Sequence, residues 1–147
     1  MFDVQNSVIS TIYYISFISY SLVAFLSTIF GLIYLIKDSF MPYHSEALKL
    51  SWSDLETDLQ VLIIALMRAA SGGFLATGLA MMILLIIPFQ ARNSWSIYAI
   101  FAISLCTSVG TLYATLLVKT KTPGNPPFIL SFAAVALTVI GFICSLV

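Results

Sequence analysis

The sequence predicts an all-α membrane protein, a bundle of four transmembrane helices that forms a single domain over residues 1–147. Apolar residues make up 61% of the chain and charged residues 8%, whereas soluble domains average about 45–50% and about 25%. Four separate stretches reach the roughly 20 mostly apolar residues that a spanning helix needs. None of them contains Asp, Glu or Lys, and none shows the alternating polarity of a transmembrane β-strand. The lipid bilayer is therefore the expected partner.

The same composition argues against other classes of protein. Six Lys and Arg residues balance six Asp and Glu residues, so the basic excess typical of a nucleic-acid-binding protein is missing. No metal or other cofactor is expected, because His44 is the only histidine and the two cysteines lack the spacing of a metal site. Cys106 and Cys144 are expected at depths that differ by about 10 Å, which is too far for a disulfide.

The four spans are expected at about residues 8–36, 61–87, 95–118 and 128–147. The first is too long to be a signal peptide, and no basic region precedes it. Pro88 is expected to end the second span, because proline donates no backbone hydrogen bond and disfavours helix in the residue before it. A Pro-Gly-Asn-Pro-Pro turn should separate the third span from the fourth.

The first connection, residues 37–60, holds five of the six acidic residues. Ser51 and Asp54 have the spacing of a capping box, and Leu50 and Leu55 have that of a hydrophobic staple. The acidic residues that follow suit the N-terminal end of a helix dipole. These signals predict a short amphipathic helical extension that begins outside the bilayer and runs into the second span.

The charged residues of the connections do not determine the orientation of the bundle in the membrane. The first and third connections carry four lysines, whereas the second carries Arg92 alone. This excess favours a cytoplasmic location for the first and third connections. An even number of spans, however, often goes with both termini inside, so both orientations remain.

Small residues recur at intervals of four in the second and third spans, a pattern that lets helix backbones approach closely in a membrane. We therefore expect these two spans to be the most closely packed pair, through Gly72, Gly73, Gly110 and Ala114. The same rows would serve equally well as the contact face of a homo-oligomer, and the sequence does not separate the two uses.

Arg68 is the one charged residue inside a predicted span. The segment from Arg68 to Ile87 forms about 30 Å of helix, which matches the hydrocarbon core, so Arg68 is expected close to the interface. One interpretation pairs it there with a carboxylate of the first connection or with a lipid phosphate. The other makes it the anion-binding residue of a polar pocket, because a guanidinium binds carboxylate or phosphate through two bonds.

Other polar residues fall on the same side of the membrane as Arg68. His44 and Glu46 follow the first span, and Tyr113 approaches that side from the third. The topology therefore allows a ligand-binding cluster of His44, Glu46, Arg68 and Tyr113, although a lone histidine is more simply a surface residue. No catalytic residue is identified. The Ser, Thr and Tyr residues between positions 10 and 21 predict that this part of the first span faces protein or a polar cavity rather than lipid.

Three short strings carry a resemblance to a known group of proteins. They are Met41-Pro42-Tyr43-His44, Arg68-Ala69-Ala70-Ser71-Gly72-Gly73, and Leu112-Tyr113-Ala114-Thr115 with the prolines that follow. Together they resemble a family of small bacterial four-helix inner-membrane proteins, and more loosely the DoxX-like class. The resemblance implies a four-helix fold and a location in the bacterial inner membrane, and it implies no activity.

Two functions follow from these observations. The first is a non-enzymatic scaffold, accessory or lipid-binding bundle, acting alone, as a homo-oligomer or with a membrane partner protein. The second is a membrane-embedded enzyme or carrier for an amphipathic anionic ligand, with Arg68 as the anion-binding residue. We expect the first. A small dimeric transporter is disfavoured, because the spans contain none of the acidic residues used in proton-coupled export.

Overall fold

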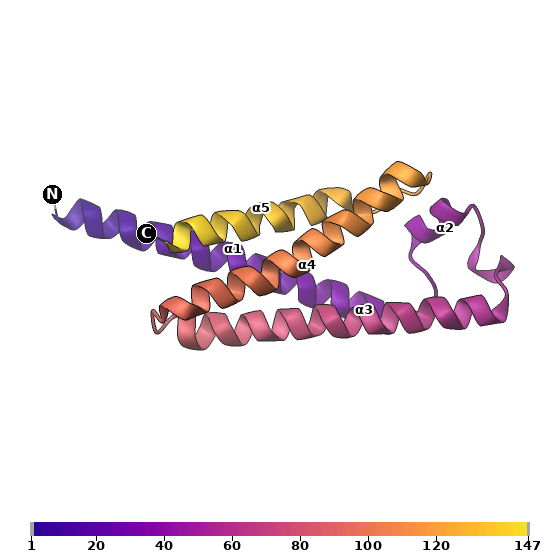
Figure 1. Ribbon diagram of the computed structural model, residues 1–147, viewed down its shortest axis with the longest axis horizontal. Helices are drawn as coiled ribbons and strands as arrows, with labels where there is room; N and C mark the ends of the chain where they lie inside the picture. Colours follow the sequence, from indigo (N-terminus) through magenta and orange to yellow (C-terminus); the bar gives the residue numbers. More distant parts are fainter. Residues whose placement is uncertain (1, 147) are drawn as a thin grey trace.

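The computed structural model describes residues 2–146, with side chains for residue 7 and for residues 9–146, and within that range it contains helices and no strands. Figure 1 shows the helices as a bundle, with the chain ends at one end and the short helix α2 at the other. In order, the elements are α1 (Phe2–Ile36), α2 (Pro42–Leu48), the 3₁₀ turn η1 (Trp52–Asp54), α3 (Thr57–Leu84), the π-helical turn η2 (Leu85–Phe89), α4 (Ser94–Lys121) and α5 (Phe128–Ser145).

Four helices are long and apolar enough to cross a membrane, over Ile9–Ile36, Thr57–Phe89, Ser94–Lys121 and Phe128–Ser145. The prediction of an all-α, four-span bundle is confirmed, and these dimensions are those of an integral membrane protein. The helices differ in length. Together α3 and η2 contain 33 residues and α5 contains 18, which correspond to about 50 Å and about 27 Å of helix.

The second span does not end at Pro88 as expected. Pro88 lies inside η2, where the helix widens to a π turn that continues to Phe89. The widening accommodates a residue that has no N–H, and the Asn93 N–H donates to the Pro88 carbonyl five residues back, at 2.9 Å. The chain then reverses at Arg92, whose φ of 58° lies in the left-handed region. That conformation costs a non-glycine residue about 1 kcal/mol.

The extension before the second span is only partly as predicted. The Asp54 carboxylate accepts hydrogen bonds from the Ser51 hydroxyl and from the Ser51 N–H, the latter at 3.0 Å. The hydroxyl contributes most to holding the pKa of Asp54 below its usual value. This cap starts only the turn η1, because Leu55 is extended and α3 begins at Thr57. A further helix, α2, was not predicted from the sequence; it has Pro42 at its first position, a favoured site for proline.

The closest helix pair is α1 with α3, and not the second and third spans as expected. A side chain at Gly78 would collide with the Thr28 hydroxyl and come within 3.1 Å of the Ala24 carbonyl. A side chain at Gly31 would lie 2.7 Å from Leu75 Cγ. These two glycines therefore permit the close approach of α1 and α3.

The four residues predicted to pack helices together do not do so within the chain. Gly72, Gly73 and Gly110 are exposed and would have open space around an added Cβ atom, and Ala114 is also exposed. Spacing alone identified small residues, whereas the rotation of each helix decides which of them face a neighbour. The use of this row as a homo-oligomer face stays a prediction.

The core lies where α1 meets α3, η2, α4 and α5. Tyr20, Met81 and Ile100 are completely buried there. The hydroxyl of Ser16, also buried, donates to the Gly141 carbonyl at 2.7 Å and ties α1 to α5. The prediction that the polar face of the first span turns toward protein is thus confirmed for Ser16 and Tyr20. The two cysteines are free thiols, as expected.

Candidate functional site

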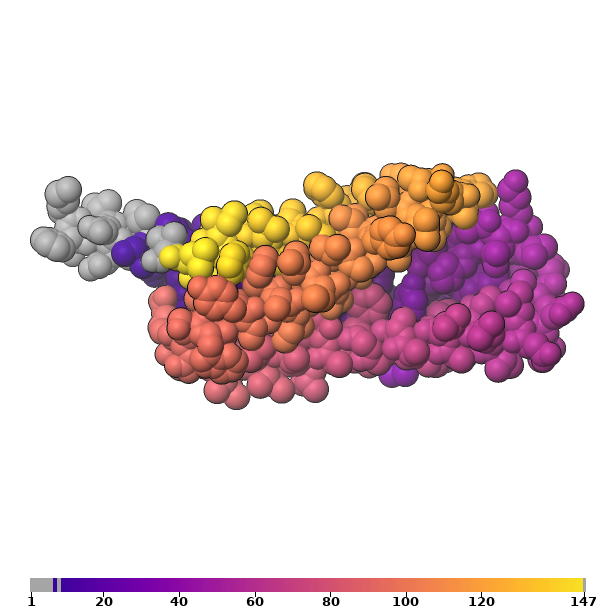
Figure 2. All heavy atoms as spheres, viewed as in Figure 1, coloured from indigo at the N-terminus to yellow at the C-terminus, as the bar shows by residue number. Residues whose placement is uncertain are grey.

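A cleft opens between α3 and α4 toward the α2 end of the bundle. The two helices are bridged midway by the Thr77 and Thr107 hydroxyls, 3.0 Å apart. Beyond this bridge they enclose a cavity of about 390 Å³, and Figure 2 shows the hollow between the orange end of α4 and the purple segments opposite. The α3 and α4 walls of the cavity consist of Ala70, Phe74, Gly110, Thr111, Ala114, Thr115 and Val118.

A second hollow, of about 430 Å³, lies on the other side of α2. It is mostly apolar, with Ile63, Leu66 and Met67 of α3 on one wall. Both hollows are lined by Tyr34 and His44, which therefore stand at the boundary between them. We call the two hollows and this boundary the α2 cleft.

The boundary carries hydrogen-bonding groups without a net charge. The hydroxyls of Tyr34, near the end of α1, and Tyr43, in α2, form a short hydrogen bond with each other. Only one of the two protons lies in this bond, so the other O–H group remains a donor. Burial raises the pKa of Tyr43 far above its usual value, so this phenol stays protonated.

His44 adds a second donor. Its Nδ1 accepts a hydrogen bond from the Met41 N–H at 3.3 Å, across the first turn of α2. Since Nδ1 is the acceptor, the proton of the neutral ring is assigned to Nε2. Burial lowers the pKa of the His44 imidazole below its usual value of 6.5. At neutral pH the ring is therefore neutral and presents Nε2–H as a donor.

Contacts with the loop between α4 and α5 hold α2 in place. The Glu46 carboxylate accepts a hydrogen bond from the Asn125 N–H at 2.9 Å, which joins α2 to the loop between α4 and α5. Gly124 in the same loop approaches so closely that an added Cβ atom would lie 2.6 Å from the Tyr43 carbonyl oxygen. Glu46, predicted as a ligand-binding residue, thus serves to anchor α2.

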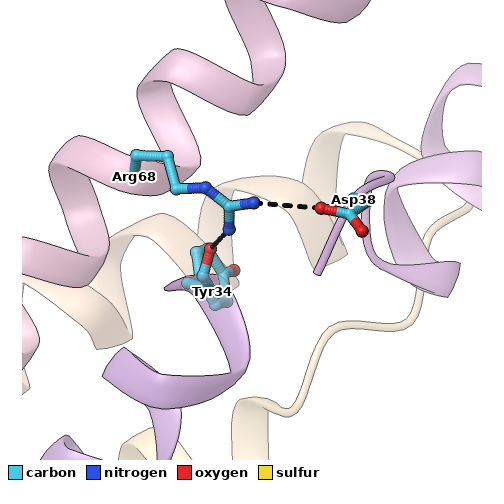
Figure 3. Close-up of polar contacts among 3 residues, drawn as sticks. All are labelled: Tyr34, Asp38 and Arg68. Atoms are coloured by element: carbon cyan, nitrogen blue, oxygen red, sulfur yellow. Dashed lines mark hydrogen bonds and ion pairs between the residues drawn. The ribbon is translucent and has the colours of Figure 1, made fainter. Parts of the chain in front are cut away.

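Arg68 is engaged by the end of α1 (Figure 3). Its Nη1 donates to the Tyr34 carbonyl at 2.7 Å, and its Nη2 donates to the Asp38 carboxylate at 3.2 Å. The Asp38 side chain is 95% exposed and that of Arg68 is 32% exposed. Of the two interpretations of Arg68, pairing with a carboxylate of the first connection is the one that the structure shows. Arg68 is absent from the residues that line the α2 cleft.

The predicted cluster of four residues is therefore not assembled as such. His44 lines the α2 cleft, Glu46 anchors α2, and Arg68 caps α1. Tyr113 is 67% exposed and lies outside the lining of both hollows. The role of Tyr34 and Tyr43 was not predicted from the sequence, where the one available signal was a tyrosine near the end of the first span and another in the connection that follows it.

The His44 bond predicts a pH-dependent seating of α2. A protonated imidazole cannot accept from Met41, and the lowered pKa means that the undocked segment binds the proton more readily. Docking of α2 should be fully stable above pH 6.5, the ordinary pKa of His, and should weaken as the pH falls below it.

Trp52 can report this change, because it packs edge-on against Phe40, with ring centroids 5.1 Å apart, and Phe40 packs against His44. Trp52 fluorescence in a Trp95→Phe background should therefore change between pH 7.5 and 5.

The matched control is His44→Gln, which places at the same helical position a residue that can make the capping bond and does not titrate. The fluorescence change should disappear in this variant. An identical pH profile in both proteins would assign the change to carboxylates instead.

No protein-family model matches this chain, and neither the curated proteins nor the solved structures that were compared with it contain a match. The resemblance to small four-helix inner-membrane proteins stays a prediction.

Proposed function

We propose that this chain is a non-enzymatic integral membrane protein that binds one uncharged amphipathic molecule in the α2 cleft. The observation that carries the proposal is the meeting of two hollows, about 390 and 430 Å³, at the paired donors Tyr34–Tyr43 and His44. Pockets for small molecules measure about 300–1,000 Å³ and combine apolar walls with a few polar groups. The α2 cleft has this character.

The chemistry of the lining selects the polar end of the ligand. One tyrosine O–H and the His44 Nε2–H are donors, and none of the residues lining the two hollows carries a formal charge at neutral pH. An ester or ketone carbonyl matches two neutral donors. An anion would match Arg68, but that guanidinium already pairs with Asp38 and the Tyr34 carbonyl, and it lies outside the lining of both hollows. We therefore favour a neutral lipid over the anionic ligand considered from the sequence.

The cleft lies between two helices that are apolar enough to span a membrane, α3 and α4, so we propose that a lipid tail enters it from the bilayer. The resemblance noted in the sequence supports a bacterial inner membrane as the location. The proposed role is storage or presentation of the lipid, since the described residues offer donors but no nucleophile paired with a base.

Filling the cleft should abolish binding. Gly110 lines the cavity and has open space around an added Cβ atom, so Gly110→Leu should occupy the hollow with little effect on folding. The matched control is Gly73→Leu, since Gly73 is also exposed and helical but is absent from the lining. Native mass spectrometry with added diacylglycerol should show one retained adduct in the wild type and in Gly73→Leu, and none in Gly110→Leu.

Retention of the adduct in all three proteins, or its absence from the wild type, would contradict the proposal. Phosphatidic acid offered in place of diacylglycerol tests the charge of the ligand. If the protein retained phosphatidic acid more strongly than diacylglycerol, and if this retention required Arg68, an anionic ligand would be favoured over a neutral lipid.

A further inference from the structure

A second polar cavity lies at the opposite end of the bundle, around Arg92. It measures about 250 Å³ and is enclosed by residues of α1, η2, α4 and α5. Its polar lining comes from Arg92, Asn93, Ser94, Ser96, Cys144 and Ser145, and none of the residues that line it is acidic. We call it the Arg92 pocket. It shares no residue with the α2 cleft.

Arg92 is held in place by an aromatic ring rather than by a carboxylate. Its guanidinium carbon lies over the Tyr13 ring, 3.5 Å from the centroid, which is a cation–π contact. Such a contact uses the face of the guanidinium and leaves the N–H groups at its edge free to donate. Among the described side chains, the one ion pair joins Arg68 to Asp38, so Arg92 has no carboxylate partner there.

Further donors surround the same cavity. Asn93 makes no side-chain cap bond to α4, and the N–H group of Ser94, which also lines the cavity, precedes the first intrahelical bond. Behind the wall, the fully buried Tyr20 hydroxyl lies beside the Ser145 side chain. The site thus combines the positive charge of Arg92 with further polar groups, and its lining contains no acidic residue.

The other side of the Arg92–Tyr13 pair faces a second cavity, whose lining is a mixture of aromatic and polar side chains. It measures about 370 Å³ and is lined by Tyr13, Tyr14, Phe17, Gln90 and Arg92. Tyr13, Tyr14 and Phe17 belong to the part of α1 that is apolar enough to cross a membrane. An acyl chain attached to a group at Arg92 could therefore run along α1 into the bilayer.

We propose that the Arg92 pocket binds a phosphate-type oxyanion, and that the neighbouring cavity, which lies along Tyr14 and Phe17 on the membrane-spanning part of α1, makes the headgroup of an acidic lipid its source. Arg92 supplies a bidentate charged donor, and the first N–H groups of α4 add the positive end of the helix dipole. Tyr13 positions the guanidinium. This site is independent of the α2 cleft and of the ligand proposed there.

The test compares binding of phosphatidylglycerol by the full-length protein in nanodiscs that otherwise contain phosphatidylcholine. Arg92→Gln should weaken the tightest phosphatidylglycerol adduct, counted by native mass spectrometry, by about tenfold. The matched control is Lys119→Gln. Lys119 also stacks on a ring, that of Phe128 at 4.6 Å, but it lies in the last turn of α4 at the other end of the helix. Both substitutions remove one positive charge, so a specific site requires that only the first weakens binding.

Two further variants keep the test decisive if Arg92→Gln folds poorly. Tyr13→Phe keeps the ring and should bind as the wild type does, whereas Tyr13→Leu keeps every charge and should lose most of the binding. Inorganic phosphate, titrated in neutral detergent, distinguishes the sources. Binding of phosphate with the same dependence on Arg92 supports a free oxyanion, and binding of the lipid alone supports a headgroup site. Equal weakening by Arg92→Gln and Lys119→Gln, or no weakening by either, overturns the proposal.

Discussion

Replacing Gly78 with alanine is expected to destabilise the bundle by about 2 kcal/mol, the middle of the range for overpacking a tight contact. The added methyl group would collide with the Thr28 hydroxyl and would press on backbone, with the Ala24 carbonyl at 3.1 Å and the Thr28 N–H at 3.2 Å. A side-chain hydroxyl can rotate away, but the two backbone groups can move only if α1 and α3 separate. The change should appear as a lower free energy of unfolding by steric trapping in bicelles.

Gly72→Ala provides the matched control for this prediction. Gly72 lies in the same helix and has open space around an added Cβ atom. An alanine there should be neutral or should stabilise the helix by about 0.5–1 kcal/mol, because it removes the conformational freedom of glycine. If the two substitutions had the same effect, the contact between α1 and α3 would not be set by Gly78. If Gly72→Ala alone were harmful, the exposed row on α3 would be the contact face.

The substitution Arg68→Met removes the charge of this side chain and should lower the free energy of unfolding by about 2 kcal/mol. This value lies within the range for hydrogen bonds to charged groups. The main loss is the 2.7 Å bond to the Tyr34 carbonyl, which belongs to the last turn of α1 and has no partner further along that helix. Asp38→Asn should cost less than about 1 kcal/mol, because exposed ion pairs contribute little in water. The same unfolding measurement in bicelles should therefore rank the two variants clearly.

Arg68→Lys refines this prediction. A lysine offers a single ammonium group in place of a fork, so it can serve Tyr34 or Asp38 but not both with good geometry. We therefore expect the free energy of unfolding of Arg68→Lys to lie between those of the wild type and Arg68→Met. A larger effect of Asp38→Asn than of Arg68→Met would show that the ion pair, and not the carbonyl bond, holds the end of α1 to α3.

The sequence predicts the four spans well because hydrocarbon imposes the same requirement on all of them. Each backbone polar group must be bonded within its own helix, so apolar length is a sufficient signal. The partner of Arg68 could also be anticipated, because depth can be counted along the helix from Ile87 and the acidic residues are concentrated in one connection. These inferences depend on position along the chain alone.

Other features depend on the rotation of a helix, which the sequence does not give. Gly78 and Gly72 are indistinguishable by spacing, yet one meets α1 and the other meets nothing. In a membrane both faces of a helix are apolar, so no amphipathic pattern reveals the rotation. A pocket on the side of the first and third connections was one of the two interpretations, but its walls were not predicted, since Gly110 and Ala114 were expected to pack against the second span and instead line the cavity. The short helix α2 is fixed by contacts with Asn125 and Gly124, which are far away in the sequence.

The unequal lengths of the helices have a consequence for the surrounding lipid. The 18 residues of α5 form about 27 Å of helix, slightly less than a typical hydrocarbon core, whereas the 33 residues of α3 and η2 form about 50 Å. Hydrophobic mismatch of this kind is relieved by thinning of the bilayer beside a short helix and by tilt or projection of a long one. The bilayer should therefore be thinnest along α5, and this asymmetry around a single small protein favours its partition into thin or deformable regions of a membrane.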